Sequence, residues 1–195
     1  LQDGLIIESV LIPDAHRLTL CVSTQVGCTL DCSFCLTGTM GLKRNLKAHE
    51  IVEQILMVQD QLKPETRLSS LVFMGMGEPL ANLEAVKDAI VRITNPTWGL
   101  SIPARRITLS TAGLASRLKD AAALGVNLAI SLNATTNGQR DRLMPAVNRL
   151  SPLEQLISAC RSYPLPPRRR LTFEYVLLSG VNDTDQDAKR LIKLL

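Results

Sequence analysis

Three cysteines in one short loop are the feature that most constrains the fold and the chemistry of this chain. Cys28, Cys32 and Cys35 have the spacing C-x3-C-x2-C, and the motif directly follows a β-prone run, residues 19–23. An odd number of cysteines, clustered in this way, indicates a metal or redox site rather than a disulfide framework. Three thiolates from one loop can each bind one iron of a [4Fe–4S] cluster. The fourth iron is then open to chelation by a small molecule that carries an amine and a carboxylate.

Zinc is the alternative metal for the same loop, because closely spaced cysteines often bind Zn²⁺. A structural zinc site needs a fourth ligand, and the chain has only two histidines, His16 and His49, and no second C-x2-C pair. Cys21 lies seven residues before Cys28, outside the usual spacing of a ligand pair. The spacing therefore favours the cluster over zinc. The remaining cysteine, Cys160, is expected to be a buried apolar residue of a helix.

Strand-like and helical segments alternate along the chain. Apolar residues recur at helical spacing after residue 48 and after Asn82, which is placed to cap its helix. Residues 151–154 have capping-box spacing, with a proline at the first helical position, and a last helix is expected from Asp183 or Thr184. The expected strands are residues 19–23, 71–74, 106–110, 126–132 and 171–178. Five strands that alternate with helices predict an α/β fold with a parallel sheet.

The loops that follow these strands carry the informative polar residues. Functional sites of such folds lie at the carboxyl ends of the strands. Residues 75–79 read Gly-Met-Gly-Glu-Pro after the second strand, and glycines allow a backbone to approach a ligand closely. Ser110 ends the third strand, and residues 131–133, Ser-Leu-Asn, end the fourth. We expect these residues and the cysteine loop to surround one site.

Composition constrains the function less than the motifs do. Hydrophobic residues make up 46% of the chain and charged residues 21%, and the net charge of +4 permits a nucleic-acid partner without arguing for one. The first residues lack the basic-then-apolar pattern of a secretory leader, and no apolar run approaches the roughly 20 residues of a membrane span. We therefore expect a cytoplasmic protein without membrane contacts.

Six stretches extend the cysteine motif into a wider pattern: residues 20–28, 74–80, 106–111, 129–133, 173–176 and 180–183. Together with Phe34 before the third cysteine, they resemble the RlmN/Cfr family of radical S-adenosylmethionine enzymes. The resemblance implies a partial (β/α)6 TIM-like barrel with about five strand–helix units present. It also implies that residues 1–195 are the core domain alone, without the family's N-terminal RNA-binding domain and its C-terminal segment with a methyl-carrying cysteine.

The resemblance implies roles for individual residues as well. Cys28, Cys32 and Cys35 match the ligands of the [4Fe–4S] cluster. The positions that match contacts to S-adenosylmethionine are Gly77, Glu78, Ser110, Ser131, Leu132 and Asn133, the last standing where the family often has histidine. Cys21 matches the cysteine that resolves a covalent RNA–enzyme intermediate by disulfide formation. Glu8 matches a glutamate near the family's active site and is a candidate catalytic residue.

The implied activity is methylation of C2 of an adenine in 23S rRNA, tRNA or both, through a methyl-cysteine intermediate. Residues 133–136, Asn-Ala-Thr-Thr, favour this RlmN branch over the Cfr branch, which methylates C8. The implied partners are RNA and an external electron donor such as flavodoxin. Two alternatives stay open, namely C8 methylation and a module that binds zinc or RNA without catalysis.

Several basic residues and one tryptophan are candidates for RNA contacts. Phosphate binding requires basic groups on one face, and a tryptophan can stack on a flipped base. The candidates are Lys43, Arg44, Lys47, Arg105, Arg106, the run Arg168 to Arg170, and Trp98. Solubilising charge and simple packing of the indole are the alternatives.

Overall fold

The computed structural model describes residues 1–15, 17–167 and 169–195. Its main sheet has the strand order β1-β2-β5-β6-β7-β8. These strands are β1 Val10–Asp14, β2 Arg17–Cys21, β5 Ser70–Phe73, β6 Ile107–Thr111, β7 Asn127–Ser131 and β8 Thr172–Glu174. Strands β2, β5, β6, β7 and β8 pair in parallel, whereas β1 pairs antiparallel with β2 at one edge. A small antiparallel pair, β3 Gln25–Val26 and β4 Arg44–Asn45, flanks the cysteine loop.

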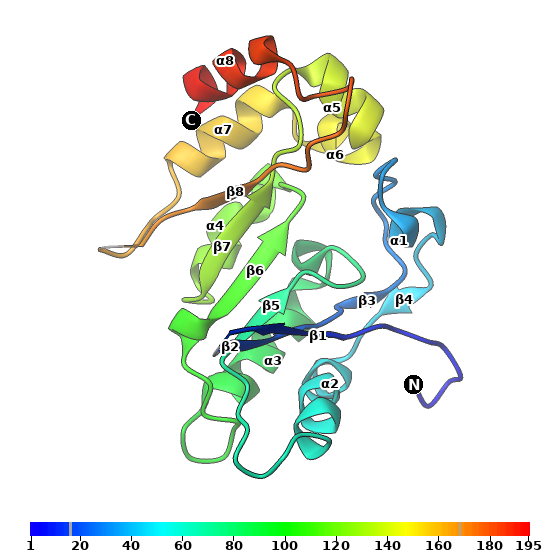
Figure 1. Ribbon diagram of the computed structural model, residues 1–195, viewed down its shortest axis with the longest axis vertical. Coiled ribbons are helices and arrows are strands. Elements are labelled where there is room, and N and C mark those ends of the chain that lie inside the picture. The colour runs from blue at the N-terminus through cyan, green and yellow to red at the C-terminus, as the bar shows by residue number, and fades with distance from the viewer. Residues whose placement is uncertain (16, 168) are drawn as a thin grey trace.

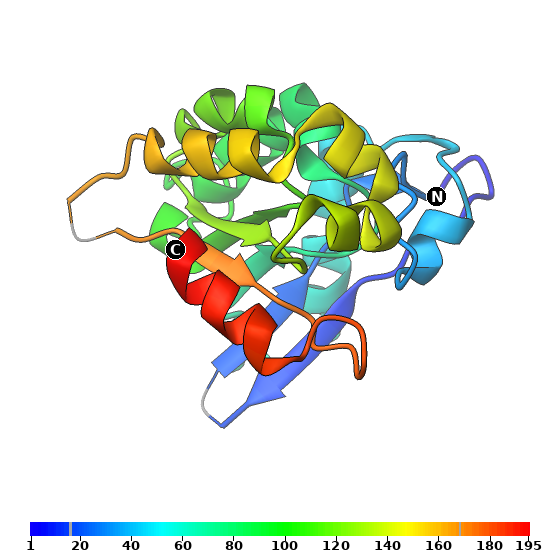
Figure 2. The same cartoon turned by 90° about the horizontal axis from the view of Figure 1, so that it is seen from above.

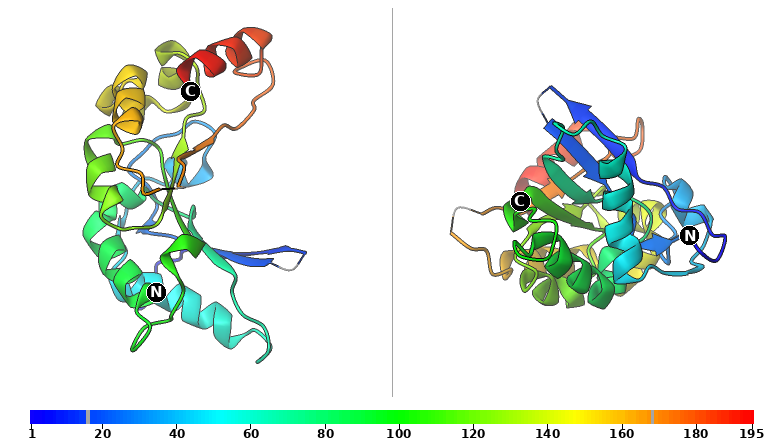
Figure 3. Two further views of the ribbon diagram at one scale, coloured as in Figure 1. Left: turned by 90° about the vertical axis from the view of Figure 1, so that its left-hand side faces the viewer. Right: turned by 90° about the horizontal axis from the view of Figure 1, so that it is seen from below.

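Helices form a layer along one side of this curved sheet. They are α2 Ala48–Asp60, α3 Leu83–Thr94, α4 Leu118–Ala122 and α7 Leu153–Arg161, and Figure 3 shows them stacked one above another. Figure 2 shows α7, in yellow, and the green helices before it on the same side of the sheet. The last helix, α8 Asp185–Leu194, lies near α7 in Figure 1, where Arg161 donates to the Leu194 carbonyl. The fold is a partial β/α barrel, which confirms the predicted class.

The hydrophobic core lies between the sheet and these helices. Alternate strand residues such as Leu71 and Phe73 of β5 point into it, while their neighbours on the strand are only half-buried. The strand residues in this core include Leu20, Leu71, Phe73, Ile107, Leu109, Leu128 and Ile130, and the helical ones include Ile51, Ile55, Val86, Ile90 and Ile93. Each such side chain contributes roughly 1.5–3 kcal/mol on burial. The sheet is thereby held with its carboxyl edge in a defined place.

The five predicted parallel strands are all present, and four of them lie within two residues of their predicted bounds. The fifth, expected over residues 171–178, is wrong in length, because only residues 172–174 pair with β7. Side chains take the hydrogen bonds of the residues that follow: Asn133 Oδ1 accepts from the Val176 amide, and Asn182 Oδ1 accepts from the Leu178 amide. The chain therefore leaves the sheet after Glu174.

Two predicted helix caps are wrong, although both helices are present. The Asn82 side chain stands at the start of α3 but donates to the carbonyl oxygens of Thr24 and Leu46, both beyond its own helix. Ser151 Oγ accepts from the Ala115 amide instead of capping α7, and the proline after it stands just outside the helix. Both side chains link distant segments, a use that local sequence patterns cannot reveal.

Some elements appear only in the structure. They are β1, the β3–β4 pair, α1 Leu36–Thr39, α5 Asn137–Leu143 and α6 Pro145–Leu150. Helices α5 and α6 meet at Met144 and form an elbow that contacts the cysteine loop. Within the described ranges, none of the helices combines the length and the hydropathy that a membrane span requires.

Candidate active site

A cavity of about 480 Å³ lies at the carboxyl ends of the parallel strands. This volume is in the range of pockets that hold a cofactor-sized ligand. Eight of the eleven candidate residues from the sequence line it, namely Cys28, Cys32, Cys35, Gly77, Glu78, Ser110, Ser131 and Asn133. Apolar side chains complete the lining, among them Phe34, Phe73, Met74, Met144 and Val176. The strand-end loops therefore do meet at one site.

The cysteine loop is held against the elbow between α5 and α6. The Ser33 amide donates to the Leu143 carbonyl at 2.9 Å, and the Asp31 carboxylate accepts from the Ala146 amide at 2.9 Å. An apolar group, here called the elbow cluster, packs against Cys28 and Cys32 and consists of Leu30, Leu143, Met144 and Val147. A segment more than 100 residues further along the chain thus positions the loop.

The three cysteines of the motif are free thiols that face the cavity. Burial raises the pKa of the Cys28 thiol, and burial together with the neighbouring Cys28 raises the pKa of Cys32 to about 12. Such thiols are protonated at neutral pH, and metal binding would displace their protons.

The arrangement suits an iron–sulfur cluster better than a zinc ion. In the part of the chain that the structure describes, no three side chains of His, Cys, Asp or Glu converge as the ligands of one metal ion do. Zinc requires such convergence, since its ligands share one centre about 2.3 Å from each sulfur. The thiolates of an iron–sulfur cube bind separate irons, so they need to share a cavity without converging on one point.

The glycines of the Gly-Met-Gly-Glu-Pro loop are required by packing against the protein's own chain. A Cβ at Gly75 would lie 2.8 Å from the Val22 carbonyl oxygen, and one at Gly77 would lie 2.5 Å from Gln25 Cβ. Gly77 also has a φ of +99°, which disfavours other residues. The chain's own packing therefore requires glycine at both positions on this side of the loop, and the close approach of a ligand on the other side stays a prediction. Both glycines line the cavity, and their carbonyl oxygens accept no hydrogen bond from the described residues.

Glu78 is a buried link between two of the strand-end loops. Only 2% of the residue is exposed, and its carboxylate accepts from the Leu80 amide at 3.0 Å and the Ala112 amide at 2.8 Å. Burial raises the pKa of this carboxyl, and the bound amides and the Thr111 hydroxyl oppose that rise. Glu78 therefore holds the end of β6 in place in addition to lining the cavity.

Glu174, at the end of β8, was not among the candidate residues, yet it joins two of them. Its Oε2 accepts from Ser110 Oγ at 2.7 Å and from Ser131 Oγ at 3.2 Å. The three residues end or nearly end β6, β7 and β8, and all of them line the cavity. Sequence reasoning missed Glu174 because it lay inside the expected strand 171–178 rather than after it.

Asn133 continues the same wall of the cavity. It is 2% exposed and has a φ of +54°, in the left-handed region that asparagine tolerates better than most residues. Its Oδ1 accepts from the Val176 amide, and its carbonyl accepts from Asn182 Nδ2. The side-chain amide thus replaces a backbone partner and holds the segment after β8 beside the cavity.

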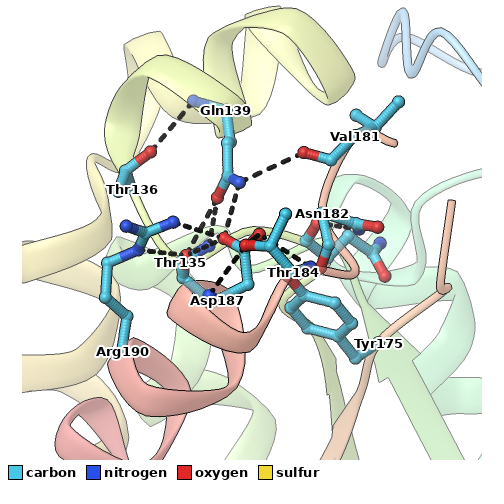
Figure 4. A network of polar contacts seen from close by, with 10 residues as sticks. Thr135, Thr136, Gln139, Tyr175, Val181, Asn182, Thr184, Asp187 and Arg190 are labelled. Carbon is cyan, nitrogen blue, oxygen red and sulfur yellow. Dashed lines mark hydrogen bonds and ion pairs between the residues drawn. The ribbon is translucent and has the colours of Figure 1, made fainter. Parts of the chain in front are cut away.

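A buried polar network, joined to Asn133 through Asn182, attaches α8 to this wall (Figure 4). Asp187 Oδ1 accepts from Thr135 Oγ1 at 2.7 Å, from Gln139 Nε2 at 2.7 Å and from Arg190 Nη2 at 2.6 Å. Burial disfavours the charged form of Asp187, but the hydrogen bonds from Thr184, Thr135, Gln139 and Arg190 outweigh it and lower the pKa. The segment that carries Asn133 is consequently fixed from outside the cavity.

Three candidate residues lie outside the cavity lining. Leu132 is fully buried in the main core. Cys21 is a free thiol at the end of β2, where burial raises its pKa and the backbone of Met74 opposes that rise. Glu8 is exposed, and its backbone carbonyl accepts from Ser23 Oγ. In this structure, these three side chains are therefore not placed to contact a ligand in the cavity.

The candidate RNA contacts do not gather at the cavity either. Arg44 is paired with Asp3 and Glu50, and this guanidinium holds the pKa of the Glu50 carboxyl at about 2. The segments that precede β6 and β8, with residues 104–106 and 169–170, lie at the amino ends of those strands, opposite the cavity. The loop of Trp98, between α3 and β6, lies at the same end. Arg168 lies outside the described residues.

The fold and the cavity together define the class of protein. The family model for the radical SAM superfamily matches residues 22–194. Because this match covers most of the chain, the chain belongs to the radical SAM superfamily. Membership implies a [4Fe–4S] cluster and S-adenosylmethionine as cofactors, and the three thiols beside a strand-end cavity fit the cluster.

Similar proteins narrow the relationship further. The whole chain is 58% identical to a protein of Syntrophobacter fumaroxidans named dual-specificity RNA methyltransferase RlmN, and 48% identical to a probable one of Aquifex aeolicus. It spans 57% and 56% of their lengths, little more than half.

Solved structures agree with this relationship. The crystal structure of a radical SAM methyltransferase from Sphaerobacter thermophilus is 45% identical and matches 99% of this chain and 57% of its own, with a TM-score of 0.93. Spore photoproduct lyase covers 98% of this chain at a TM-score of 0.59. Its sequence is only 13% identical, and the likeness therefore concerns the fold alone.

Proposed function

We propose that this chain is the catalytic core of an RNA methyltransferase that methylates C2 of an adenine in 23S rRNA, tRNA or both. The observation that carries the proposal is the single cavity in which three motif thiols face a polar wall of Ser110, Ser131 and Glu174. The names of the similar proteins support RNA as the substrate and the RlmN type of reaction.

The residues of the chain have complementary tasks in this proposal. Cys28, Cys32 and Cys35 would hold the cluster, and the carbonyl oxygens of Gly75 and Gly77 would accept from the ammonium group of S-adenosylmethionine. Bound at the reduced cluster, this cofactor supplies a 5′-deoxyadenosyl radical, which avoids the polar methyl transfer that an adenine ring carbon resists. The wall that contains Glu174 would orient hydroxyl groups, and the apolar lining would keep water away.

Further parts of the reaction are proposed for the whole protein. We place the RNA-binding domain and the methyl-carrying cysteine in the parts of the similar proteins that residues 1–195 do not span. An external electron donor such as flavodoxin would reduce the cluster, and Glu8 is retained as a candidate catalytic residue that would have to approach the site. The proposed RNA substrates place the protein in the cytoplasm.

An anaerobic assay tests the proposal directly. After reconstitution with iron and sulfide, the chain should turn brown and, with a strong reductant, slowly cleave S-adenosylmethionine to 5′-deoxyadenosine without methylating RNA. Chromatography with methyl-labelled cofactor and ribosomal RNA follows both products. A colourless protein with stoichiometric zinc would contradict the cluster. Label in RNA with only residues 1–195 present would contradict a methyl-carrying cysteine outside them.

Replacement of Cys21 tests its proposed role in product release. In the full-length enzyme, Cys21→Ala should leave the iron content unchanged but leave RNA covalently attached, because a thiol must resolve the methylene link. Denaturing electrophoresis detects the adduct, and Cys160→Ala, which removes a buried thiol of α7, is the matched control. Normal turnover by the Cys21 variant would return this residue to a packing role.

A further inference from the structure

Arg140, on α5, is a completely buried cation without an acidic partner. Its exposed fraction is 0%, and none of the salt bridges among the described residues includes it. Two guanidinium nitrogens donate to the carbonyl oxygens of Ser151 at 2.8 Å and Ala112 at 2.6 Å, and Nε has no partner. Burial of an unpaired charge is costly, so its two hydrogen bonds alone are a weak reason for an arginine here.

Two links connect Arg140 to the cysteine loop. Ala112, whose carbonyl it binds, lines the cavity and packs against the elbow cluster, as Cys28 and Cys32 do. Along α5, Arg140 lies one turn before Leu143, whose carbonyl accepts from the Ser33 amide. Arg140 thus binds a residue that lines the cavity and lies on the helix whose end holds the cysteine loop.

The side chain keeps its charge at neutral pH. Burial lowers the pKa of Arg140 to about 10, and the fields of Cys32 and Cys160 oppose this reduction. The positive charge is therefore fully buried, on the helix that ends at the elbow. In such surroundings charges interact more strongly than they do in water. Glu78 binds the other side of Ala112 but is not ion-paired with Arg140.

We propose that the buried positive charge of Arg140 raises the reduction potential of the cluster bound by Cys28, Cys32 and Cys35. Reduction brings one electron from an external reductant into the cluster, and the reduced form carries one more negative charge. No bond forms or breaks, and Arg140 keeps its proton. A fixed cation behind the thiolates stabilises the more negative form and so makes reduction easier. The inference rests on the proposed function, because it requires a cluster at this loop.

Redox titration of charge variants tests the inference. The reconstituted proteins are wild type, Arg140→Lys, Arg140→Met and Arg140→Gln, with Arg142→Met as a control at an exposed position of the same helix. Iron and sulfide content reports on cluster loading, and electron paramagnetic resonance at controlled potential reports on the midpoint. Both neutral variants at residue 140 should have a more negative midpoint than wild type. The lysine variant and the Arg142 control should stay within the error of replicate titrations.

The outcomes separate this inference from the proposed function. A wild type without iron and sulfide would overturn the proposed function itself. Full loading with an unshifted midpoint in Arg140→Met or Arg140→Gln would overturn only the electrostatic role. An equal shift in the lysine and the neutral variants would also overturn it, because hydrogen bonding rather than charge would then be responsible. Failure of all three variants at residue 140 to load would mean that Arg140 is a structural link and nothing more.

Discussion

The cavity has two walls, one with the motif cysteines and one with Glu174. The residues of the first wall are close together in the sequence, whereas those of the second are far apart. All three motif thiols come from residues 28–35, and Phe34 beside them is 38% exposed. The opposite wall joins Ser110, Ser131 and Glu174 from three strands by hydrogen bonds. Behind it, the buried network around Asp187 fixes the segment that follows β7.

This difference shows which wall depends on a ligand for its final form. The thiols of Cys28 and Cys32 on the cysteine wall have raised pKa values and would lose their protons on metal binding, so the cluster would complete that wall. The polar groups of the other wall already have partners within the protein, which favours a preformed surface. Substitutions on the two walls should therefore have separable effects on cluster loading and on cofactor affinity.

The largest effect is expected from the cysteine wall. Replacement of Cys28, Cys32 or Cys35 by Ala should remove stable cluster assembly, since three-thiolate ligation leaves no spare ligand. Iron and sulfide analysis should fall from about four of each per chain to near zero. Cys160→Ala, on α7 and outside the cavity lining, should load normally. Near-normal iron in any single motif variant would contradict the assignment.

The next effect concerns the network behind the other wall. Asp187→Asn should lower the free energy of unfolding by about 2–3 kcal/mol at neutral pH, because Arg190 and its neighbours lose a charged acceptor. Denaturant unfolding measures the change, and Asp185→Asn, exposed at the start of the same helix, should cost less than about 1 kcal/mol. Iron content should be unchanged in both variants. A variant at residue 187 that loses iron would show that the walls are not independent.

Acidification extends the same comparison. The pKa of Asp187 is lowered in the folded state relative to the unfolded value of about 4. Its stabilising contribution is therefore complete above that pH and is lost as the pH falls further. The difference in stability between wild type and Asp187→Asn should shrink below about pH 4. A difference that grows on acidification would contradict the charged, hydrogen-bonded state of Asp187.

A smaller effect is expected at the lining itself. Glu174→Gln should weaken binding of S-adenosylmethionine to the reconstituted protein by about tenfold, or about 1.4 kcal/mol, because the charged acceptor for Ser110 and Ser131 is lost. Equilibrium dialysis under anaerobic conditions measures the affinity, and Glu84→Gln on the exposed face of α3 is the control. Unchanged affinity would remove Glu174 from the cofactor site.

The smallest effect is expected where the cysteine loop contacts the elbow. Asp31→Ala should destabilise the chain by about 1 kcal/mol, since the carboxylate accepts from the Ala146 amide in the first turn of α6. Thermal unfolding of the unloaded chain detects the loss, with Asp120→Ala on the exposed side of α4 as control. Cluster loading should remain complete, and a large loss of iron would show that the elbow is essential for the loop.

The sequence by itself determined the repeating order of strands and helices and most of the cavity lining. Apolar runs and helical periodicity depend on neighbouring residues, so the bounds of four parallel strands could be predicted closely. The cysteine motif and the Gly-Met-Gly-Glu-Pro loop are also local patterns. Both lie after strands, and the parallel topology brings such loops to one edge.

The tertiary structure alone decided which side chains join those loops. Glu174, Asn182 and Asp187 bind partners between 3 and 64 residues away, and only the folded chain brings the distant pairs together. The same reason explains why Asn82 and Ser151 do not cap their helices: each found a partner in a distant segment. A buried polar group must be hydrogen-bonded, and the fold, rather than the local sequence, determines which groups are buried beside it.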